Sequence, residues 1–375
     1  MRLPPGWCQP GVDCLLNVCV IGWLVVLMEH NAGAGIGYGD DIYRAAGAVV
    51  LPTPEDVFAQ AEMIVKVKEP QPGEIARLRR GQILFTYLHL AADKAQTEGL
   101  IRSGATCIAY ETVTNAYNTL PLLAPMSEVA GRMAVQVGAH CLEREQGGAG
   151  ILLGGVPGVP PAKVVVLGGG VAGTNAARMA VGLEASVTII DRSLRRLNEL
   201  DLQFGARATT LFATAEAIEH AALAADLVIG AVLIPGAAAP RLLTRDMVRR
   251  MRSGSVIVDI AIDQGGCFET SRPTTHAAPT YVEEGVVHYC VTNMPGAVAR
   301  TSTFALTNAT LPFVLALAEK GAKTALLDDR YLCTGLNIHA GQVTHAAVAQ
   351  ALGLHYILPR DALMGGPRMA GGGGS

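Results

Sequence analysis

Hydrophobic and polar positions alternate along this chain in two series of short apolar runs separated by helix-like stretches. In the first series, the apolar runs predict strands over 62–67, 82–88 and 106–109. A helix is predicted to begin at Pro54 with Thr53 as its N-cap, and another over 74–80 that Gly81 stops. Alternation over such lengths is typical of a parallel sheet with right-handed crossovers.

The second series follows a long predicted helix over 127–145. Its apolar runs predict strands over 164–166, 187–190, 226–232, 255–262 and 287–291. Another long apolar helix is predicted over 303–319, and the roughly 50 residues beyond it are too few to form a domain alone. We therefore expect two doubly wound, Rossmann-like α/β domains joined by long helices. Residues 126–302 are expected to be inserted into a discontinuous first domain of residues 1–125 and 303–375.

The composition agrees with a large α/β enzyme that has buried parallel strands. Of the 375 residues, 50% are hydrophobic and 16% are charged, and the formal net charge is −3. This charge, with no long run of either sign, provides no electrostatic footprint for nucleic acid or an acidic membrane. The apolar stretch over 15–28 is shorter than the roughly 20 residues that cross a bilayer. We expect neither nucleic acid nor a membrane as a partner.

The eight cysteines include no C-x-x-C pair and no histidine at zinc-ligand spacing. They are interpreted as reduced thiols of a cytoplasmic protein, and no metal site is expected.

The segment Lys163–Gly173 carries the strongest chemical signal. It has glycines in a G-x-G-x-x-G pattern between a predicted strand and a predicted helix. Gly168 and Gly170 suit the sharp turn, Gly170 the approach of a pyrophosphate, and Gly173 close packing of helix on strand. The alternative is a glycine-rich turn without a ligand.

Asp191 ends the next predicted strand, 18 residues after Gly173 (191 − 173). A carboxylate there would accept hydrogen bonds from ribose hydroxyls and repel a 2′-phosphate, which favours NAD as cofactor. Arg192 directly after it could hold such a phosphate and weakens the argument.

Three polar side chains lie at strand ends, where ligands bind in open α/β sheets. Lys68 could hold a carboxylate or polarise a carbonyl, and His89 could pass a proton near neutral pH. The alternatives are a surface lysine and a core histidine. Asp263 suits contact with a ribose, a water or an amine, or is an ordinary turn acid. Asp259, inside an apolar strand, is interpreted as a buried structural acid.

The chain closely resembles the alanine dehydrogenase family from about Asn31 to at least Thr344. The motifs that carry the resemblance are Val67–Pro70, Leu84–Leu90, Ala109–Thr112, Leu123–Gly131, Gly154–Gly158, Asp259–Gly266 and Asn293–Pro295. The nicotinamide nucleotide transhydrogenase α subunit contains the same two-domain unit. The resemblance implies an NAD-dependent enzyme that converts L-alanine to pyruvate and ammonia and back, usually as a homohexamer.

Residue roles follow from the resemblance. It makes His89 and Asp263 the catalytic pair, and Lys68, Tyr87 and Glu111 the substrate-binding residues. The cofactor site would be lined by Ser127, Gly168, Gly170, Val171, Ala172, Gly173, Asp191, Arg196, Val232, Leu233, Ile260, Asp263, Val291, Asn293 and Met294.

The beginning of the chain departs from the family. Alanine dehydrogenases open with an Arg-x-x-x-Thr-Pro segment whose arginine binds the substrate carboxylate, whereas this chain has no Arg or Lys between Arg2 and Arg44. Residues 1–27 are either a misread start or real divergence. The alternative function is therefore a catalytically impaired NAD-binding homologue.

Overall fold

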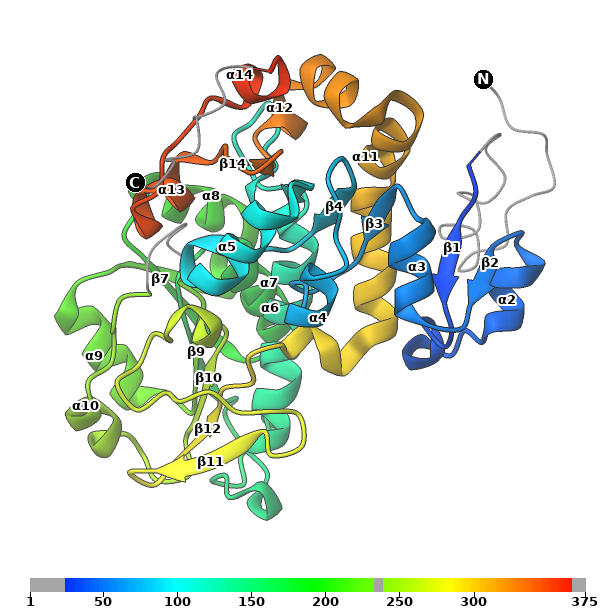
Figure 1. Ribbon diagram of the computed structural model, residues 1–375. Helices are drawn as coiled ribbons and strands as arrows, with labels where there is room; N and C mark the ends of the chain where they lie inside the picture. Colours follow the sequence, from blue (N-terminus) through cyan, green and yellow to red (C-terminus); the bar gives the residue numbers. More distant parts are fainter. Residues whose placement is uncertain (1–23, 233–238, 366–375) are drawn as a thin grey trace. The chain divides into compact units, whose positions relative to one another are not determined.

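The computed structural model describes residues 24–232 and 239–365. The chain forms two compact units, one of Met1–Pro125 with Thr303–Ser375 and the other of Met126–Ser302. The predicted α/β class is confirmed, since strands and helices alternate along both units (Figure 1). The chain passes from one unit to the other within two helices, α6 (Ala124–Cys141) and α11 (Ala299–Asp328).

The second unit contains a seven-stranded sheet in the order β11-β12-β10-β9-β6-β7-β8. Its strands are β6 (Lys163–Leu167), β7 (Ser186–Asp191), β8 (Ala208–Phe212), β9 (Leu227–Gly230), β10 (Val256–Asp259), β11 (Thr280–Glu283) and β12 (Val286–Tyr289). Only the β11–β12 pair is antiparallel among these described strands. With the parallel strands numbered along the chain, the order is 3-2-1-4-5-6, the doubly wound arrangement whose switch point lies between β6 and β9.

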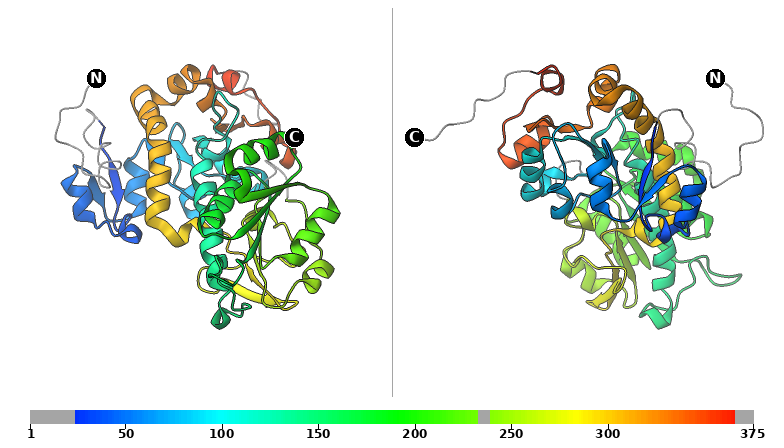
Figure 2. Two further views of the ribbon diagram at one scale, coloured as in Figure 1. Left: turned by 180° about the vertical axis from the view of Figure 1, so that it is seen from behind. Right: turned by 45° about the vertical axis from the view of Figure 1, so that its right-hand side comes forward.

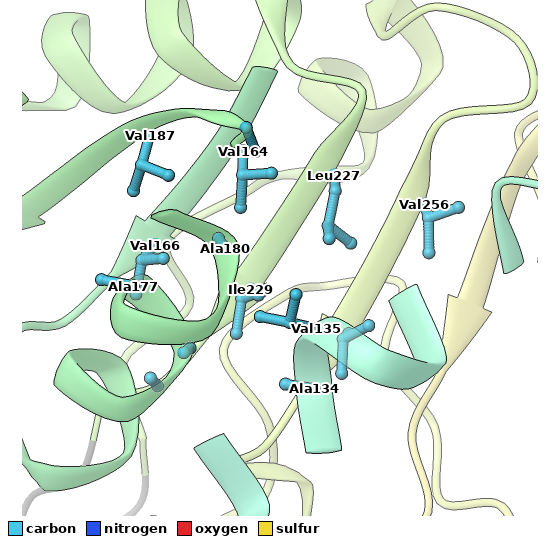
Figure 3. Close-up of a cluster of buried hydrophobic side chains, with 14 of the residues drawn as sticks. Ala134, Val135, Val164, Val166, Ala177, Ala180, Val187, Leu227, Ile229 and Val256 are labelled. Atoms are coloured by element: carbon cyan, nitrogen blue, oxygen red, sulfur yellow. The ribbon is translucent and has the colours of Figure 1, made fainter. Parts of the chain in front are cut away.

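Helices cover both faces of this sheet (Figure 2). They are α6, α7 (Val171–Gly182) and α8 (Leu194–Phe204) on one face, and α9 (Ala215–Ala224) and α10 (Arg245–Arg250) on the other. The alternation within β6 shows why both faces are apolar. Val164 and Val166 pack with small residues of α7 and α6 (Figure 3), whereas Val165 and Leu167 pack with α9 and α10. A strand buried on both faces therefore appears in the sequence as a continuous apolar run.

The first unit contains a five-stranded sheet in the order β14-β13-β5-β4-β3 and a separate parallel pair, β1 (Leu27–Glu29) and β2 (Val49–Leu51). The strands of the larger sheet are β3 (Met63–Val65), β4 (Ile83–Thr86), β5 (Thr106–Ala109), β13 (Leu336–His339) and β14 (Gln342–Val343). β3, β4 and β5 are parallel, and β13 joins β5 antiparallel. The segment after α11 therefore returns to the first sheet.

The helices of the first unit are α2 (Asp40–Ala45), α3 (Pro54–Gln60), α4 (Pro72–Ile75), α5 (Lys94–Ser103), α12 (Arg330–Cys333), α13 (Ala346–Leu352) and α14 (Pro359–Leu363). The predicted start of α3 is confirmed, because the Thr53 hydroxyl accepts a hydrogen bond from the Asp56 amide at 3.2 Å. Short 3₁₀ turns complete the two units, namely η1 (Ala34–Ile36), η2 (Leu90–Ala92), η3 (Tyr110–Thr112), η4 (Arg144–Gln146), η5 (Gly205–Arg207), η6 (Ile262–Gln264) and η7 (Met294–Val298).

The helix predicted over 74–80 is wrong in its position. α4 instead spans Pro72–Ile75, because a capping box of Gln71 and Glu74 starts it earlier. Arg79 then donates to the carbonyl of Phe58 at 2.6 Å, which ties this residue to the end of α3 rather than to a helix of its own.

The sequence does not predict the strands β1, β2, β13 and β14 of the first unit, or the two edge strands of the second unit, β8 and β11. The burial of β8 and β11 is broken by exposed positions, so neither has the apolar run of the central strands.

The long C-terminal helix α11 extends beyond the predicted 303–319. The stretch Met294–Asp328 is long and apolar enough to cross a membrane by length and composition, with a mean hydropathy of 1.3. A core helix of a globular protein passes the same test, but only 22% of the 18-residue apolar window is buried within the chain; Leu306, Leu317 and Leu326 are buried residues of α11. Gly321 interrupts the helix with a φ of 71°.

Candidate active site

The turn from β6 into α7 is built from three glycines. Gly168 has a φ of 98°, in the left-handed region that favours glycine. A Cβ on Gly173 would lie 1.8 Å from the carbonyl oxygen of Gly168, so only glycine lets the helix begin this close to the strand. Among the described residues, no atom lies within 4 Å of a Cβ placed on Gly170. A tight turn, open space beside the backbone and close helix packing are the three properties that a pyrophosphate-binding turn needs.

The first turn of α7 supplies amide donors at this place. Gly170 is the N-cap, and no side chain caps the helix. The first intrahelical bond comes from the Thr174 amide to the Gly170 carbonyl at 2.9 Å, so the amides of Val171, Ala172 and Gly173 precede the helical ladder. Such amides and the helix dipole favour an anion.

Asp191, at the end of β7, is half-buried beside the glycine turn. Its Oδ2 accepts a hydrogen bond from the Gly169 amide at 2.7 Å, and its Oδ1 accepts one from the Ser193 amide at 2.8 Å. Each carboxylate oxygen retains a further lone pair, so the group can still accept hydrogen bonds from two ribose hydroxyls.

Arg196, on α8, reaches the same glycine from the other side. Its Nε donates to the Gly169 carbonyl at 2.6 Å and its Nη2 to the Thr174 hydroxyl at 2.7 Å. Its Nη1 donates to Glu199 at 2.7 Å. The middle residue of the turn is therefore held at both its amide and its carbonyl.

Asp263 is exposed in η6, directly after β10. Asp259 fixes the loop that carries it: its carboxylate accepts hydrogen bonds from the Ala261 amide at 3.1 Å, the Cys267 amide at 2.8 Å and the Ser271 hydroxyl at 2.6 Å. Burial raises the pKa of Asp259. The interpretation of Asp259 as a buried structural acid is confirmed.

The other cofactor-site candidates of this unit differ in how much of their side chains is accessible. Val171 is exposed, whereas Val291 and Met294 are buried in the core and could offer a ligand little beyond their backbone. Half-buried positions are Ser127, Ala172, Val232, Ile260 and Asn293. Leu233 lies outside the described residues.

In the first unit, the substrate-site candidates gather where β4 ends. His89 has a left-handed backbone, with φ 48° and ψ 38°. Glu111 holds this turn: its carboxylate accepts hydrogen bonds from the Leu88 amide at 3.2 Å and from the His89 amide at 2.7 Å. Gln96 adds a bond from its amide to the Leu88 carbonyl at 2.6 Å.

The His89 ring lies between two carboxylates. Its Nε2 is 3.5 Å from Glu69 and its Nδ1 is 3.9 Å from Glu111. The ring is also parallel to that of Tyr87, with centroids 5.9 Å apart. With 43% of its side chain exposed, His89 is accessible to a ligand and is not an enclosed core histidine.

Lys68 and Tyr87 differ in what they can offer a substrate. Lys68 is exposed at the end of β3, while its neighbour Lys66 pairs with Glu74 at 2.5 Å. The Tyr87 hydroxyl donates to the Leu122 carbonyl at 2.6 Å, and burial raises its pKa. Tyr87 therefore supports the His89 ring, with its hydroxyl already engaged.

Sequence reasoning missed Glu69, Gln96, Thr174 and Glu199. Glu69 follows Lys68 at the same strand end, which is a usable signal. The spacing of Arg196 and Glu199 on a helix is another. The bonds of Gln96 and Thr174 to loop carbonyls have no sequence signature.

No group of three or more His, Cys, Asp or Glu side chains is placed to hold a metal within the described ranges. Cys107, Cys141, Cys267, Cys290 and Cys333 are free thiols. Cys8, Cys14 and Cys19 lie outside those ranges.

Comparisons with known proteins cover both units. The family model "Alanine dehydrogenase/PNT, N-terminal domain" matches residues 21–130 and "Alanine dehydrogenase/PNT, C-terminal domain" matches residues 134–346. The chain is 63% identical over 332 residues to the alanine dehydrogenase of Halomonas elongata, covering 88% of this chain and 90% of that protein. It is 55% identical over 347 residues to that of Bacillus subtilis, covering 92% and 91%.

Solved structures give a similar result. An L-alanine dehydrogenase matches with a TM-score of 0.87 and 53% identity, over 91% of this chain and 94% of that one. A transhydrogenase from Sinorhizobium meliloti matches with a TM-score of 0.75 and 27% identity, over 90% and 94%.

Proposed function

Because this chain belongs to the alanine dehydrogenase/PNT family, we propose that it is an NAD-dependent alanine dehydrogenase, which interconverts L-alanine with pyruvate and ammonia. The observation that carries the proposal is the match over most of both chains to proteins named alanine dehydrogenase. The transhydrogenase likeness is weaker in both identity and TM-score.

The residues of the second unit fit NAD. The glycine turn leaves room at Gly170, the first amides of α7 suit a pyrophosphate, and Asp191 has acceptor capacity for a ribose. When bound, NAD supplies the nicotinamide that accepts a hydride from the α-carbon of alanine. The protein supplies binding, orientation and proton transfer.

In this proposal Lys68 holds the substrate carboxylate or carbonyl oxygen with its ammonium group. Loss of a hydride from the α-carbon of the neutral amine leaves an iminium ion. Water adds to this ion with loss of a proton to form a carbinolamine, which expels ammonia to leave pyruvate. Asp263 orients the attacking water, or the ammonia in the reverse direction. His89 takes the proton from the oxygen as the carbinolamine collapses and returns it in reverse. The carboxylates of Glu69 and Glu111 lie 3.5 and 3.9 Å from the two ring nitrogens and can orient the ring for this exchange.

We also propose a cytoplasmic homohexamer with no membrane or nucleic-acid partner. The formal charge of −3, with no long run of either sign, supports the last two points, and the family resemblance supports the hexamer. Sedimentation velocity of the purified chain tests the oligomer, and a monomer would contradict it.

The decisive test of the function is loss of NADH absorbance on adding pyruvate and ammonia together. We expect turnover only when both are present. NADH binding without turnover would favour the impaired homologue, in which Lys68 lacks the family's arginine as a second carboxylate ligand. Hydride transfer from NADH to an NADP analogue, with no need for ammonia, would favour a transhydrogenase-like activity.

A further inference from the structure

Two arginines, Arg192 and Arg196, lie near the carboxylate of Asp191, and either could attract the 2′-phosphate that distinguishes NADP from NAD. We propose that Glu199 is a cofactor-specificity residue, which withholds Arg196 from a 2′-phosphate and so reinforces the preference for NAD. The inference rests on the proposed function and deepens its cofactor site.

All three nitrogen positions of the Arg196 guanidinium are engaged. Nε and Nη2 are bonded to the glycine turn through the Gly169 carbonyl and the Thr174 hydroxyl, at 2.6 and 2.7 Å. Nη1 is bonded to Glu199, which is the only acid among these three partners. Two of the bonds therefore position the arginine, and the third neutralises its charge.

Arg196 is positioned on the ribose side of the turn. Gly169 donates its amide to Asp191 and offers its carbonyl to Arg196, so the acid and the arginine contact the same residue. In dinucleotide-binding domains an acid at the position of Asp191 holds the ribose 2′-hydroxyl, and an arginine nearby accommodates a 2′-phosphate. Arg196 has the location for the second role, but its charge is paired.

Glu199, on α8, is suited to keep Arg196 from binding a 2′-phosphate. It accepts hydrogen bonds from Arg196 at 2.7 Å and from Arg195 at 3.2 Å. The bond from Arg196, followed by that from Arg195, lowers the pKa of the Glu199 carboxyl, so it stays ionised near neutral pH. Arg192, by contrast, is exposed in the turn after β7.

Replacing Glu199 by alanine should free Nη1 of Arg196, whose side chain is already held in place by its other two nitrogens. Nη1 would lose its acceptor, while Nε and Nη2 would stay on the glycine turn, so little side-chain entropy is lost when a phosphate binds. Asp191 would still repel the phosphate, and Asp191→Asn removes that repulsion while keeping an oxygen for the Gly169 amide. The gain should therefore be larger in the Asp191→Asn background.

The experiment measures dissociation constants of NADH and NADPH by fluorescence titration for the parent, Glu199→Ala, Asp191→Asn and the double variant. Calorimetric titration of the cofactor-free proteins with 2′,5′-ADP and with ADP gives the same comparison without the nicotinamide. In the Asp191→Asn background, we expect Glu199→Ala to raise the affinity for NADPH relative to that for NADH by about tenfold. This is the lower end of the range for one charge-assisted hydrogen bond. A smaller improvement is expected with Asp191 present.

Two controls separate this mechanism from a general change of charge. Glu98→Ala removes a comparable helix-surface acid, 45% exposed beside Lys94 and Arg102, and should leave both constants unchanged. Adding Arg196→Ala to Glu199→Ala should cancel the gain in NADPH affinity.

Several results would overturn the inference. One is an unchanged NADPH:NADH ratio in Glu199→Ala proteins that bind NADH normally. Another is a gain that survives removal of Arg196 but disappears in Arg192→Ala, which would assign the phosphate to Arg192. A parent chain that binds neither cofactor would instead refute the proposed function and this inference with it.

Discussion

The candidate cofactor site and the candidate substrate site are built from different kinds of groups. In the second unit, the candidate cofactor site is mainly backbone: the glycine turn and the first amides of α7. In the first unit, the candidate substrate site is made of side chains, with His89 and Lys68 exposed at strand ends. The backbone site should be sensitive to any added atom, whereas the side-chain site should be sensitive to the loss of specific functional groups.

A carboxylate fixes the backbone in both units. Glu111 accepts hydrogen bonds from the amides of Leu88 and His89, and Asp191 accepts hydrogen bonds from the amides of Gly169 and Ser193. The sequence analysis predicts that Glu111 binds the substrate and that Asp191 binds the cofactor. The hydrogen bonds indicate that each also holds the loop on which its neighbours depend, so deleting either one would mix two effects.

The largest expected effect is on the side-chain site. His89→Ala should reduce turnover by about 10²- to 10⁴-fold, the usual contribution of general acid–base catalysis, and leave the NADH dissociation constant unchanged. Steady-state kinetics and fluorescence titration measure the two quantities. The control is His140→Ala, because His140 also pairs with a glutamate, Glu143, at 3.2 Å, but on the surface of α6. If His89→Ala lowered turnover only twofold, His89 would have a structural role and no catalytic one.

Asp263→Asn should reduce turnover and also weaken NADH binding, because Asp263 lies in η6, the turn that follows β10 of the cofactor-binding unit. The same two measurements apply. Unchanged NADH affinity would restrict Asp263 to the substrate. Asp259→Asn is the contrasting variant: the buried acid holds the loop through three bonds, so its loss should lower the thermal midpoint as well.

Alanine variants of three glycines in the second unit should distinguish effects on NADH binding from effects on folding stability. Gly173→Ala places a Cβ 1.8 Å from the Gly168 carbonyl oxygen, and should cost about 1–3 kcal/mol of stability together with NADH affinity. The Cβ of Gly170→Ala meets nothing within 4 Å in the part of the chain that the structure describes, so this variant should weaken NADH binding at unchanged stability. Gly182→Ala, in space that the described residues leave open at the end of the same helix, should leave NADH binding unchanged and raise stability by up to about 1 kcal/mol. Normal NADH binding by Gly170→Ala would place the pyrophosphate elsewhere.

The smallest effect concerns acid sensitivity. Burial lowers the pKa of His288 in the second unit and of His339 and His345 in the first. Below an unfolded pKa of about 6.5, the unfolded chain binds more protons than the folded one, so stability present above that pH is lost as pH falls towards the folded values. Amide exchange at pH 7.5 and 5.5 should show a larger loss of protection in the first unit. Equal losses in both units would contradict this.

The sequence predicted most of what depends on burial and on glycine. The central strand β6 and the turn after it have strong patterns, because a strand covered on both faces must be apolar and Gly168 and Gly173 have no substitute. Edge strand β8 was missed because its partial exposure removes the apolar run. The predicted helix over 74–80 failed because the capping box of Gln71 and Glu74 starts the helix at Pro72, and the Arg79 side chain then holds the following residues against the carbonyls of Phe58 and Ala61.

The hydrogen bonds of Asp191 and Arg196 to Gly169 could not be predicted from the sequence, because they depend on tertiary packing. Asp191 and Arg196 are recognisable as charged residues of a cofactor domain, but their bonds to one glycine depend on how α8 packs. Sequence spacing indicates that Arg196 and Glu199 share a helix face, and not that this arginine is tied to a loop. The role of Glu199 follows only from the contacts.

The left-handed backbone of His89 has an evolutionary consequence. A residue with a side chain pays about 1–2 kcal/mol to adopt this conformation, whereas glycine adopts it freely. A change from His89 to glycine would therefore relieve this strain and remove the imidazole at the same time. Selection for abundance and selection for turnover oppose each other at this position, so a lineage that no longer needed the reaction should lose His89 early while keeping the fold intact.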